Sequence, residues 1–167
     1  MTSLLFPGSF DPFTRGHRDI ARRAARICDK LYVVALNNNV KKYTFTLEER
    51  VDMCRKSLSE LENVEVLGSD GLLVDCFRDL GCRAVVRGIR SESDFRYEAE
   101  MALANRLLYP DYDVTLMLCR DDLSLISSSI VKEVGSYGGD ISRMLPAPIV
   151  DFVSERLMKG RNSNGEQ

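Results

Sequence analysis

The residues of this sequence best suited to chemistry lie between Gly8 and His17, in a loop that contains the only histidine of the chain. The segment Gly8-Ser9-Phe10-Asp11-Pro12 follows a short apolar run and is rich in turn-forming residues. Gly16 and His17 then stand where a helical pattern begins. A strand, a tight loop and a helix start gather backbone N–H groups and an imidazole around one point. A lone histidine is usually a surface residue, but this position predicts a phosphate site in which His17 acts.

Four further polar clusters follow the other apolar segments of the chain. They are residues 37–42, 68–73, 87–90 and 120–129. In a parallel sheet, ligands bind beyond the carboxyl ends of the strands, where the strand order reverses. We therefore expect the five loops to converge on one ligand-binding face.

Two basic clusters allow two interpretations each. Lys41-Lys42 is either a solvated pair or a ligand contact just past a strand end. Arg87-Gly88-Ile89-Arg90 places two guanidinium groups around a glycine, where backbone could approach a ligand. Alternatively, these arginines form surface ion pairs with Glu92 or Asp94.

The run Ser127-Ser128-Ser129 before Ile130 is typical of a helix N-cap. Three hydroxyls and the free N–H groups of a first helical turn could also bind the terminal phosphates of a nucleotide, with Lys132 one turn on. Glu98 and Glu100 are interpreted as surface charges, although one of them could turn toward Arg87 and Arg90. Neither G-x-x-x-x-G-K-[ST] nor G-x-G-x-x-G occurs, so P-loop and dinucleotide-binding sites are poorly supported.

Five short apolar segments alternate with helical patterns, and no linker divides the 167 residues. The segments are 4–6, 31–36, 64–67, 84–87 and 114–118. Continuous apolar runs of this length indicate strands buried on both faces. The alternation predicts a single α/β domain, Rossmann-like and doubly wound, with a five-stranded parallel sheet. The domain is expected over 1–158, and a polar, mobile tail over 159–167.

Helical stripes account for the segments between the strands. The expected inward residues are Ile20, Ala24 and Ile27; Val51, Cys54, Leu58 and Leu61; Leu73, Cys76, Phe77 and Leu80; and Val150, Val153 and Leu157. A capping box, Thr46-Leu47-Glu48-Glu49, opens the second of these helices. A longer helix is expected over 93–108, before Pro110.

Composition limits the class of protein. With 23 basic and 25 acidic residues the net charge is −2, so no global charge favours nucleic acid or a membrane. The five cysteines show no C-x-x-C spacing, which indicates reduced, inert thiols. No signal-peptide pattern or apolar span of about 20 residues occurs. We expect a soluble, cytoplasmic protein.

Two of these motifs resemble those of a known superfamily. Thr14-Arg15-Gly16-His17 resembles the (H/T)-x-G-H motif of the nucleotidyltransferase α/β-phosphodiesterase superfamily, and Ile126-Ser127-Ser128-Ser129 resembles its second phosphate-binding motif. Within it, the chain is most similar to the bacterial phosphopantetheine adenylyltransferases. The ordered blocks that carry this resemblance are Phe45-Thr46-Leu47-Glu48-Glu49-Arg50, Arg87-Gly88-Ile89-Arg90, Asp94-Phe95-Arg96-Tyr97-Glu98 and Ser127-Ser128-Ser129-Ile130-Val131-Lys132-Glu133-Val134.

The resemblance implies transfer of an adenylyl group from ATP to 4′-phosphopantetheine, which gives dephospho-coenzyme A and pyrophosphate, with Mg²⁺ as cofactor. It implies that His17 stabilises the transition state and that Lys41 is catalytic. The implied ATP-binding residues are Ser9, Phe10, His17, Gly88, Ile89, Arg90, Glu98, Leu123, Ser124, Leu125, Ile126, Ser127, Ser128 and Ser129. Those implied for phosphopantetheine are Ser9, Lys41, Leu73 and Arg87. A homohexamer built as a dimer of trimers and feedback by coenzyme A are further expectations from the resemblance, while the metal ligands stay unassigned.

The implied reaction needs no general base, because the attacking phosphate, with its second pKa near 6, is largely dianionic at neutral pH. Three alternatives stay open. A cytidylyltransferase or a nicotinamide-mononucleotide adenylyltransferase would share the His17 and Ser127–Ser129 elements. A nucleotide sensor without catalysis and a flavodoxin-like electron carrier are the other two.

Overall fold

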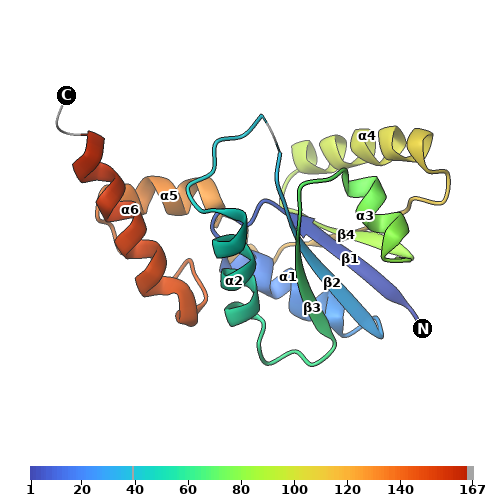
Figure 1. Cartoon of the computed structure of the whole chain (residues 1–167), viewed down its shortest axis with the longest axis horizontal. Helices are drawn as coiled ribbons and strands as arrows, with labels where there is room; N and C mark the ends of the chain where they lie inside the picture. Colours follow the sequence, from blue (N-terminus) through green and yellow to red (C-terminus); the bar gives the residue numbers. More distant parts are fainter. Residues whose placement is uncertain (39, 165–167) are drawn as a thin grey trace.

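The computed structural model describes residues 1–38 and 40–164. Five strands form one parallel sheet, as the sequence predicts. Their order in the sheet is β3-β2-β1-β4-β5, and β1 to β4 are labelled in Figure 1. Their bounds are β1 Ser3–Gly8, β2 Lys30–Leu36, β3 Val64–Ser69, β4 Ala84–Ile89 and β5 Val114–Leu118. From β1 the chain builds the sheet in one direction through β2 and β3, then returns to add β4 and β5 on the other side. The strand order therefore reverses between β1 and β4.

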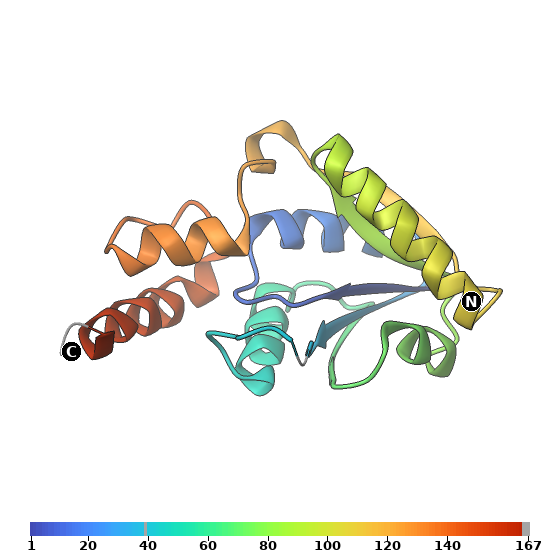
Figure 2. The ribbon, with the colours of Figure 1, turned by 90° about the horizontal axis from the view of Figure 1, so that it is seen from above.

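Six α-helices occur in the described part of the chain. They are α1 Arg15–Ala25, α2 Leu47–Ser57, α3 Leu73–Asp79, α4 Glu92–Leu108, α5 Ser128–Ser136 and α6 Val150–Asn164, with 3₁₀ turns at Asp121–Leu123 and Ala147–Ile149. Helices α5 and α6 lie side by side at the end of the molecule opposite the N-terminus (Figures 1 and 2). The expected capping box of α2 is present: Thr46 and Glu49 each accept from the other's backbone N–H.

Alternate residues of the strands enter two hydrophobic cores, one on each face of the sheet. On one face Phe6, Val33 and Val86 pack with α1, α2, α5 and α6. On the other face Leu5 and Val85 pack with α3 and with the segment before β5. The first core is the larger, and it includes Phe13 just before the start of α1 and Val131 near the start of α5. These two helix starts face the edge where the strands end.

Three sequence expectations need correction or extension. Ile27 is 59% exposed because α1 ends at Ala25, so Ala21 and Ala25 complete the inward stripe instead. The edge strand β5 has no fully buried residue, and Leu118 is 71% exposed, because no further strand covers that side. Helix α6 continues to Asn164, so it includes the first residues of the expected polar tail; residues 165–167 lie outside the described part.

Helix α4 begins one residue before the expected start, with Ser91 as its N-cap. It lies along the β4 side of the sheet (Figure 2), yet none of its residues is fully buried. Several large apolar side chains on it are exposed, among them Phe95, Leu103 and Leu107. Within the described ranges, no helix is long and apolar enough to span a membrane.

Candidate active site

Two adjoining cavities open at the edge where β1 and β4 end. The first, of about 350 Å³, lies between the start of α1, the end of β4 and the start of α5. The second, of about 740 Å³, extends past the ends of β2 and β3 to α4 and β5. Both cavities are lined by the same four residues, Gly8, Ser9, Lys41 and Arg87. Two ligands could therefore meet at this junction.

Many of the residues expected at a nucleotide line the first cavity. They are Ser9, Phe10, His17, Gly88, Arg90, Leu123, Ile126, Ser127 and Ser128. Ile89, Ser124, Leu125 and Ser129 do not line it, and Leu125 is 81% exposed. Glu98 lies in the second cavity instead, with Leu73, Lys41 and Arg87.

His17 combines a helix-capping role with a place in the first cavity. Thr14, the N-cap of α1, accepts a hydrogen bond from the His17 backbone N–H at 3.3 Å. In return, Nδ1 of His17 lies 3.1 Å from both the backbone nitrogen and Oγ1 of Thr14. A backbone N–H can only donate, so Nδ1 must be the unprotonated nitrogen. The proton of the neutral ring is then on Nε2.

Burial, together with the nearby charges of Arg90 and Arg87, lowers the pKa of His17 to about 4. The ring is therefore neutral at physiological pH. It packs against the rings of Phe10 and Phe13, with centroids 5.1 and 5.5 Å away. His17 can thus offer an oriented Nε2–H donor to a phosphate, as a fixed dipole instead of a cation.

The loop of residues 7–10 is held in an unusual conformation. Phe10 has a positive φ of 51°, a strained value for a side chain of this kind, and its buried ring packs edge-on against Phe6 and Phe13. A Cβ at Gly8 would meet the Phe10 ring at 2.5 Å, so only glycine fits there. Nη1 of Arg87 also donates to the carbonyl oxygen of Pro7 at 3.1 Å.

Arg87, within β4, and Arg90, directly after it, are both ion-paired and both line the cavities, so neither sequence interpretation excludes the other. Arg87 binds Glu98 at 2.5 Å, and this glutamate side chain is only 11% exposed. Arg90 binds Asp94 at 3.2 Å and lines the first cavity. Each carboxylate fixes the direction of its guanidinium group while leaving other N–H donors for a ligand.

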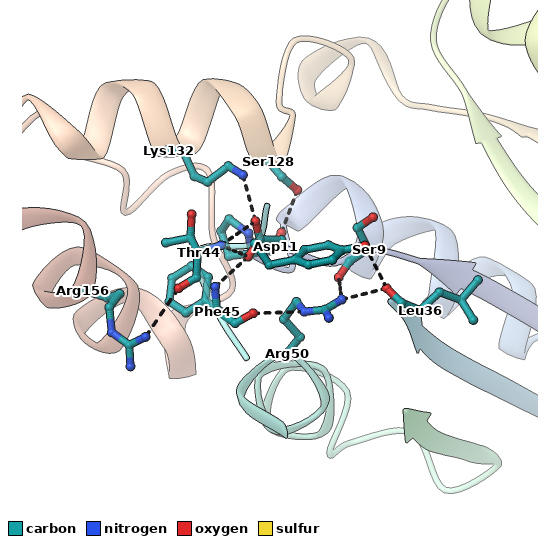
Figure 3. A network of polar contacts seen from close by, with 11 residues as sticks. Ser9, Asp11, Leu36, Thr44, Phe45, Arg50, Ser128, Lys132 and Arg156 are labelled. Carbon is teal, nitrogen blue, oxygen red and sulfur yellow. Dashed lines mark hydrogen bonds and ion pairs between the residues drawn. The ribbon is translucent and has the colours of Figure 1, made fainter. Parts of the chain in front are cut away.

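The loop that carries Lys41 is anchored at its far end by the buried carboxylate of Asp11. This carboxylate accepts from the backbone nitrogens of Thr44 (3.1 Å) and Phe45 (2.9 Å), and from Nζ of Lys132 at 2.8 Å (Figure 3). Lys132 on α5 is thus an ion-pair partner, where the sequence placed it near the phosphates. Lys41 itself is exposed and makes no ion pair within the described ranges.

The start of α5 also contacts the first loop. Ser127 is the N-cap and accepts from the Ile130 backbone N–H at 3.2 Å. Ser128 donates to the carbonyl oxygen of Pro12 at 2.8 Å (Figure 3). The hydroxyls of these serines thus have structural partners, and the free N–H groups of the first turn remain available for an anion.

Sequence reasoning missed several lining residues. Those of the second cavity include Asn37, Asp70, Tyr97, Met101, Asn105 and Tyr112. Asn37 and Asp70 fall in or beside loops expected to follow strand ends, which was a usable signal. Met101 and Asn105 on α4, and Tyr112 in the segment before β5, gave no signal, because only the packing of these segments turns them toward the cavity.

The comparisons with known proteins now define the class. Residues 5–134 match the model of the cytidylyltransferase-like family, so the chain is a nucleotidyltransferase. The fold agrees: a bifunctional NMN adenylyltransferase/ADP ribose pyrophosphatase from Francisella tularensis superposes with a TM-score of 0.73 at 14% identity. This chain is covered over 98% of its length and spans about half (53%) of that larger protein.

Full-length relatives specify the family further. The chain is 47% identical to phosphopantetheine adenylyltransferase from Heliobacterium modesticaldum over 93% of both chains. It is 42% identical to the enzyme of the same name from Lactobacillus johnsonii over 100% of this chain and 99% of the other. The chain belongs to the phosphopantetheine adenylyltransferase family.

Proposed function

We propose that this enzyme transfers the adenylyl group of ATP to 4′-phosphopantetheine in the cytoplasm, giving 3′-dephospho-coenzyme A and pyrophosphate. The observation that carries the proposal is the pair of cavities that meet at Ser9, Lys41 and Arg87. The first cavity, with its helix starts and His17, suits a nucleotide phosphate chain. The larger second cavity is lined by both apolar and amide-bearing side chains, which suits a pantetheine arm.

In this mechanism a phosphate oxygen of phosphopantetheine attacks the α-phosphorus of ATP at the junction. The new P–O bond forms as the bond to the bridging oxygen breaks, and that oxygen leaves with its electron pair as pyrophosphate. The attacking phosphate is already deprotonated, so no side chain removes a proton. Arg87 and Lys41 hold the acceptor, while the Nε2–H of His17 stabilises charge that develops on the transferring group.

Pyrophosphate release tests the proposal directly. Purified protein with ATP and Mg²⁺ is incubated with phosphopantetheine, with nicotinamide mononucleotide or with no acceptor. Release only with phosphopantetheine is the expected result. Release with nicotinamide mononucleotide alone would instead indicate the activity named for the Francisella protein.

The divalent cation that a nucleotidyltransferase needs is proposed to be Mg²⁺, entering as the magnesium salt of ATP. The lining of the first cavity includes no carboxylate, and no group of three metal-ligating side chains occurs in the part of the chain described. Excess EDTA should therefore abolish pyrophosphate release without changing the melting temperature of the free enzyme. A lower melting temperature in EDTA would indicate a resident ion.

Coenzyme A is proposed as a feedback ligand of the same site. It shares the pantetheine arm of the acceptor, so it should occupy the second cavity and reach the junction residues. The expected inhibition is competitive with phosphopantetheine. Inhibition that saturating phosphopantetheine does not relieve would place coenzyme A elsewhere.

The enzyme is further proposed to be a homohexamer. The exposed apolar side chains of α4 support assembly, since a soluble protein rarely leaves such a stripe uncovered.

A further inference from the structure

We infer that Arg50 is a positioning residue for the acceptor half of the site, which it shapes by holding the loops after β1, β2 and β3 together. The inference rests on the proposed function and adds a residue that lines neither cavity. Arg50 lies in the first turns of α2, beneath the loops, and its side chain is fully buried, with 0% exposed.

The guanidinium of Arg50 reaches two loops at once. Nη1 donates to the carbonyl oxygens of Ser9 at 2.7 Å and Leu36 at 2.9 Å (Figure 3). Nε donates to the carbonyl oxygen of Phe45 at 3.3 Å. Ser9 follows β1, whereas Leu36 and Phe45 lie at opposite ends of the loop that carries Lys41. One side chain therefore sets the distance between the loop of residues 7–10 and both ends of the loop of residues 37–45, which carries Lys41 and is called the acceptor loop below.

A short relay extends this contact to a third loop. Nη2 of Arg50 donates to Oδ1 of Asn37, and Nδ2 of Asn37 donates to Oδ1 of Asp70 at 2.5 Å. Asp70 follows β3, and both Asn37 and Asp70 line the second cavity. The ring of Tyr43 covers the guanidinium, with its centroid 4.0 Å from Cζ.

The chemistry of arginine explains why this residue type is required. A buried charge is costly, and Arg50 forms no ion pair with a carboxylate of the described chain. A neutral, apolar residue would be the better choice for stability alone. Only a planar guanidinium offers enough donors in a fixed fork to satisfy four acceptors on three separate segments. Lysine keeps the charge but cannot reach all of them.

The contacts predict an asymmetric effect on the two substrates. Arg50 touches the second cavity through Ser9, Asn37 and, by the relay, Asp70. In the first cavity it touches only Ser9, and the other walls, at β4 and α5, are held by other residues. Loosening Arg50 should therefore weaken the acceptor more than the nucleotide.

The test compares Arg50→Lys with Arg55→Lys. Arg55 is a matched control, because it lies on the same helix and also donates to a backbone carbonyl, that of Val66 at 3.1 Å, away from both cavities. We expect Arg50→Lys to raise KM for phosphopantetheine about tenfold and to lower kcat about tenfold to a hundredfold, as small misplacements of reacting groups do. KM for ATP should change less than twofold. Arg55→Lys should leave all three values unchanged.

A second variant guards against misfolding of Arg50→Lys. Asn37→Ala removes the relay from an accessible loop, so the fold should persist. It should raise KM for phosphopantetheine in the same direction, and the effects of the double variant should be less than additive, because both changes break one network. Equal shifts in both KM values, or full additivity, would overturn the inference.

The activity of the wild-type protein distinguishes a failure of the proposed function from a failure of the role of Arg50. If the wild-type protein releases no pyrophosphate with phosphopantetheine, the proposed function is contradicted. If the wild type is active and Arg50→Lys behaves as Arg55→Lys does, only the role of Arg50 is contradicted.

Discussion

His17 is a donor whose proton sits on a defined nitrogen, because Thr14 occupies the other one. This removes the usual uncertainty about a histidine near neutral pH. It also separates its role from that of an acid or a base. A donor with a pKa far below the working pH neither gains nor loses its proton as the reaction proceeds.

The pKa of His17 can be measured without assignment, since the chain has a single histidine. Its ring signal in an NMR titration should change with a midpoint at about pH 4, compared with 6.5 for an unperturbed ring. This difference in pKa also determines how stability depends on pH. Between about pH 4 and pH 6.5, His17 binds a proton in the unfolded chain but not in the folded chain. The free energy of unfolding should therefore decrease as pH falls from 6.5 to 4. A midpoint at or above 6.5 would contradict this account.

Replacement of His17 by alanine tests its role in catalysis. The loss of a donor used mainly in the transition state should lower kcat about a hundredfold to a thousandfold, with little change in either KM. The acidic limb of the rate profile, set by the second pKa of the acceptor phosphate near 6, should persist in this variant. Turnover near that of the wild type would remove His17 from the mechanism.

At the scale of elements, the glycines near the site serve different purposes. Gly8 is required by the protein itself, because a Cβ there meets the Phe10 ring at 2.5 Å. At Gly16 a Cβ would find protein atoms no closer than 3.6 Å, which is ordinary contact. Gly16 lines the first cavity, so its missing side chain leaves space for a ligand.

This contrast gives a paired prediction. Gly16→Ala should keep the melting temperature of the wild type, because the added methyl group has room against the protein. It should weaken ATP binding about tenfold, because the methyl group would occupy space that the bound ligand needs, and such overpacking costs about 1 to 3 kcal/mol. KM for phosphopantetheine should stay unchanged. Gly8→Ala should lower the melting temperature itself. Calorimetry of ATP binding and thermal melts distinguish the two, and unchanged ATP affinity in Gly16→Ala would refute the assignment.

Elements were easier to predict than contacts. The five strands and the α2 capping box follow from apolar runs and from Thr46 and Glu49, which are local patterns. Arg50 gave no such signal, because its four acceptors lie on segments up to 41 residues away. The same holds for Lys132, whose partner Asp11 is 121 residues away in sequence. Loop convergence could be expected from the sheet, but not which side chains hold the loops.

In the whole molecule, the packing of one chain does not explain why α4 exposes a face of large apolar side chains. Leu103 and Leu107 are 63% and 88% exposed, although α4 also contributes Tyr97 and Met101 to the second cavity. An assembly that covers this face would also fix one wall of the acceptor site.

Light scattering after size-exclusion chromatography tests the assembly. The wild type should have about six times the chain mass of 18.9 kDa, and the double variant Leu103→Glu/Leu107→Glu a smaller mass with an intact fold, because charges resist burial in an apolar interface. Ile27→Glu is the control, since Ile27 is similarly exposed (59%) but lies after α1. A monomeric wild type, or a double variant of unchanged mass, would contradict the hexamer.

Helix α6, the C-terminal helix of the described chain, also contacts the end of the acceptor loop. Arg156 binds Glu49 and donates to the carbonyl oxygen of Thr44 at 3.5 Å, across 112 residues of sequence. During synthesis on the ribosome, these bonds cannot form until nearly the whole polypeptide has emerged, although the strands that carry the loop are made much earlier. The acceptor loop is thus completed last, and a nascent chain that stops short of Arg156 lacks the bonds that finish it.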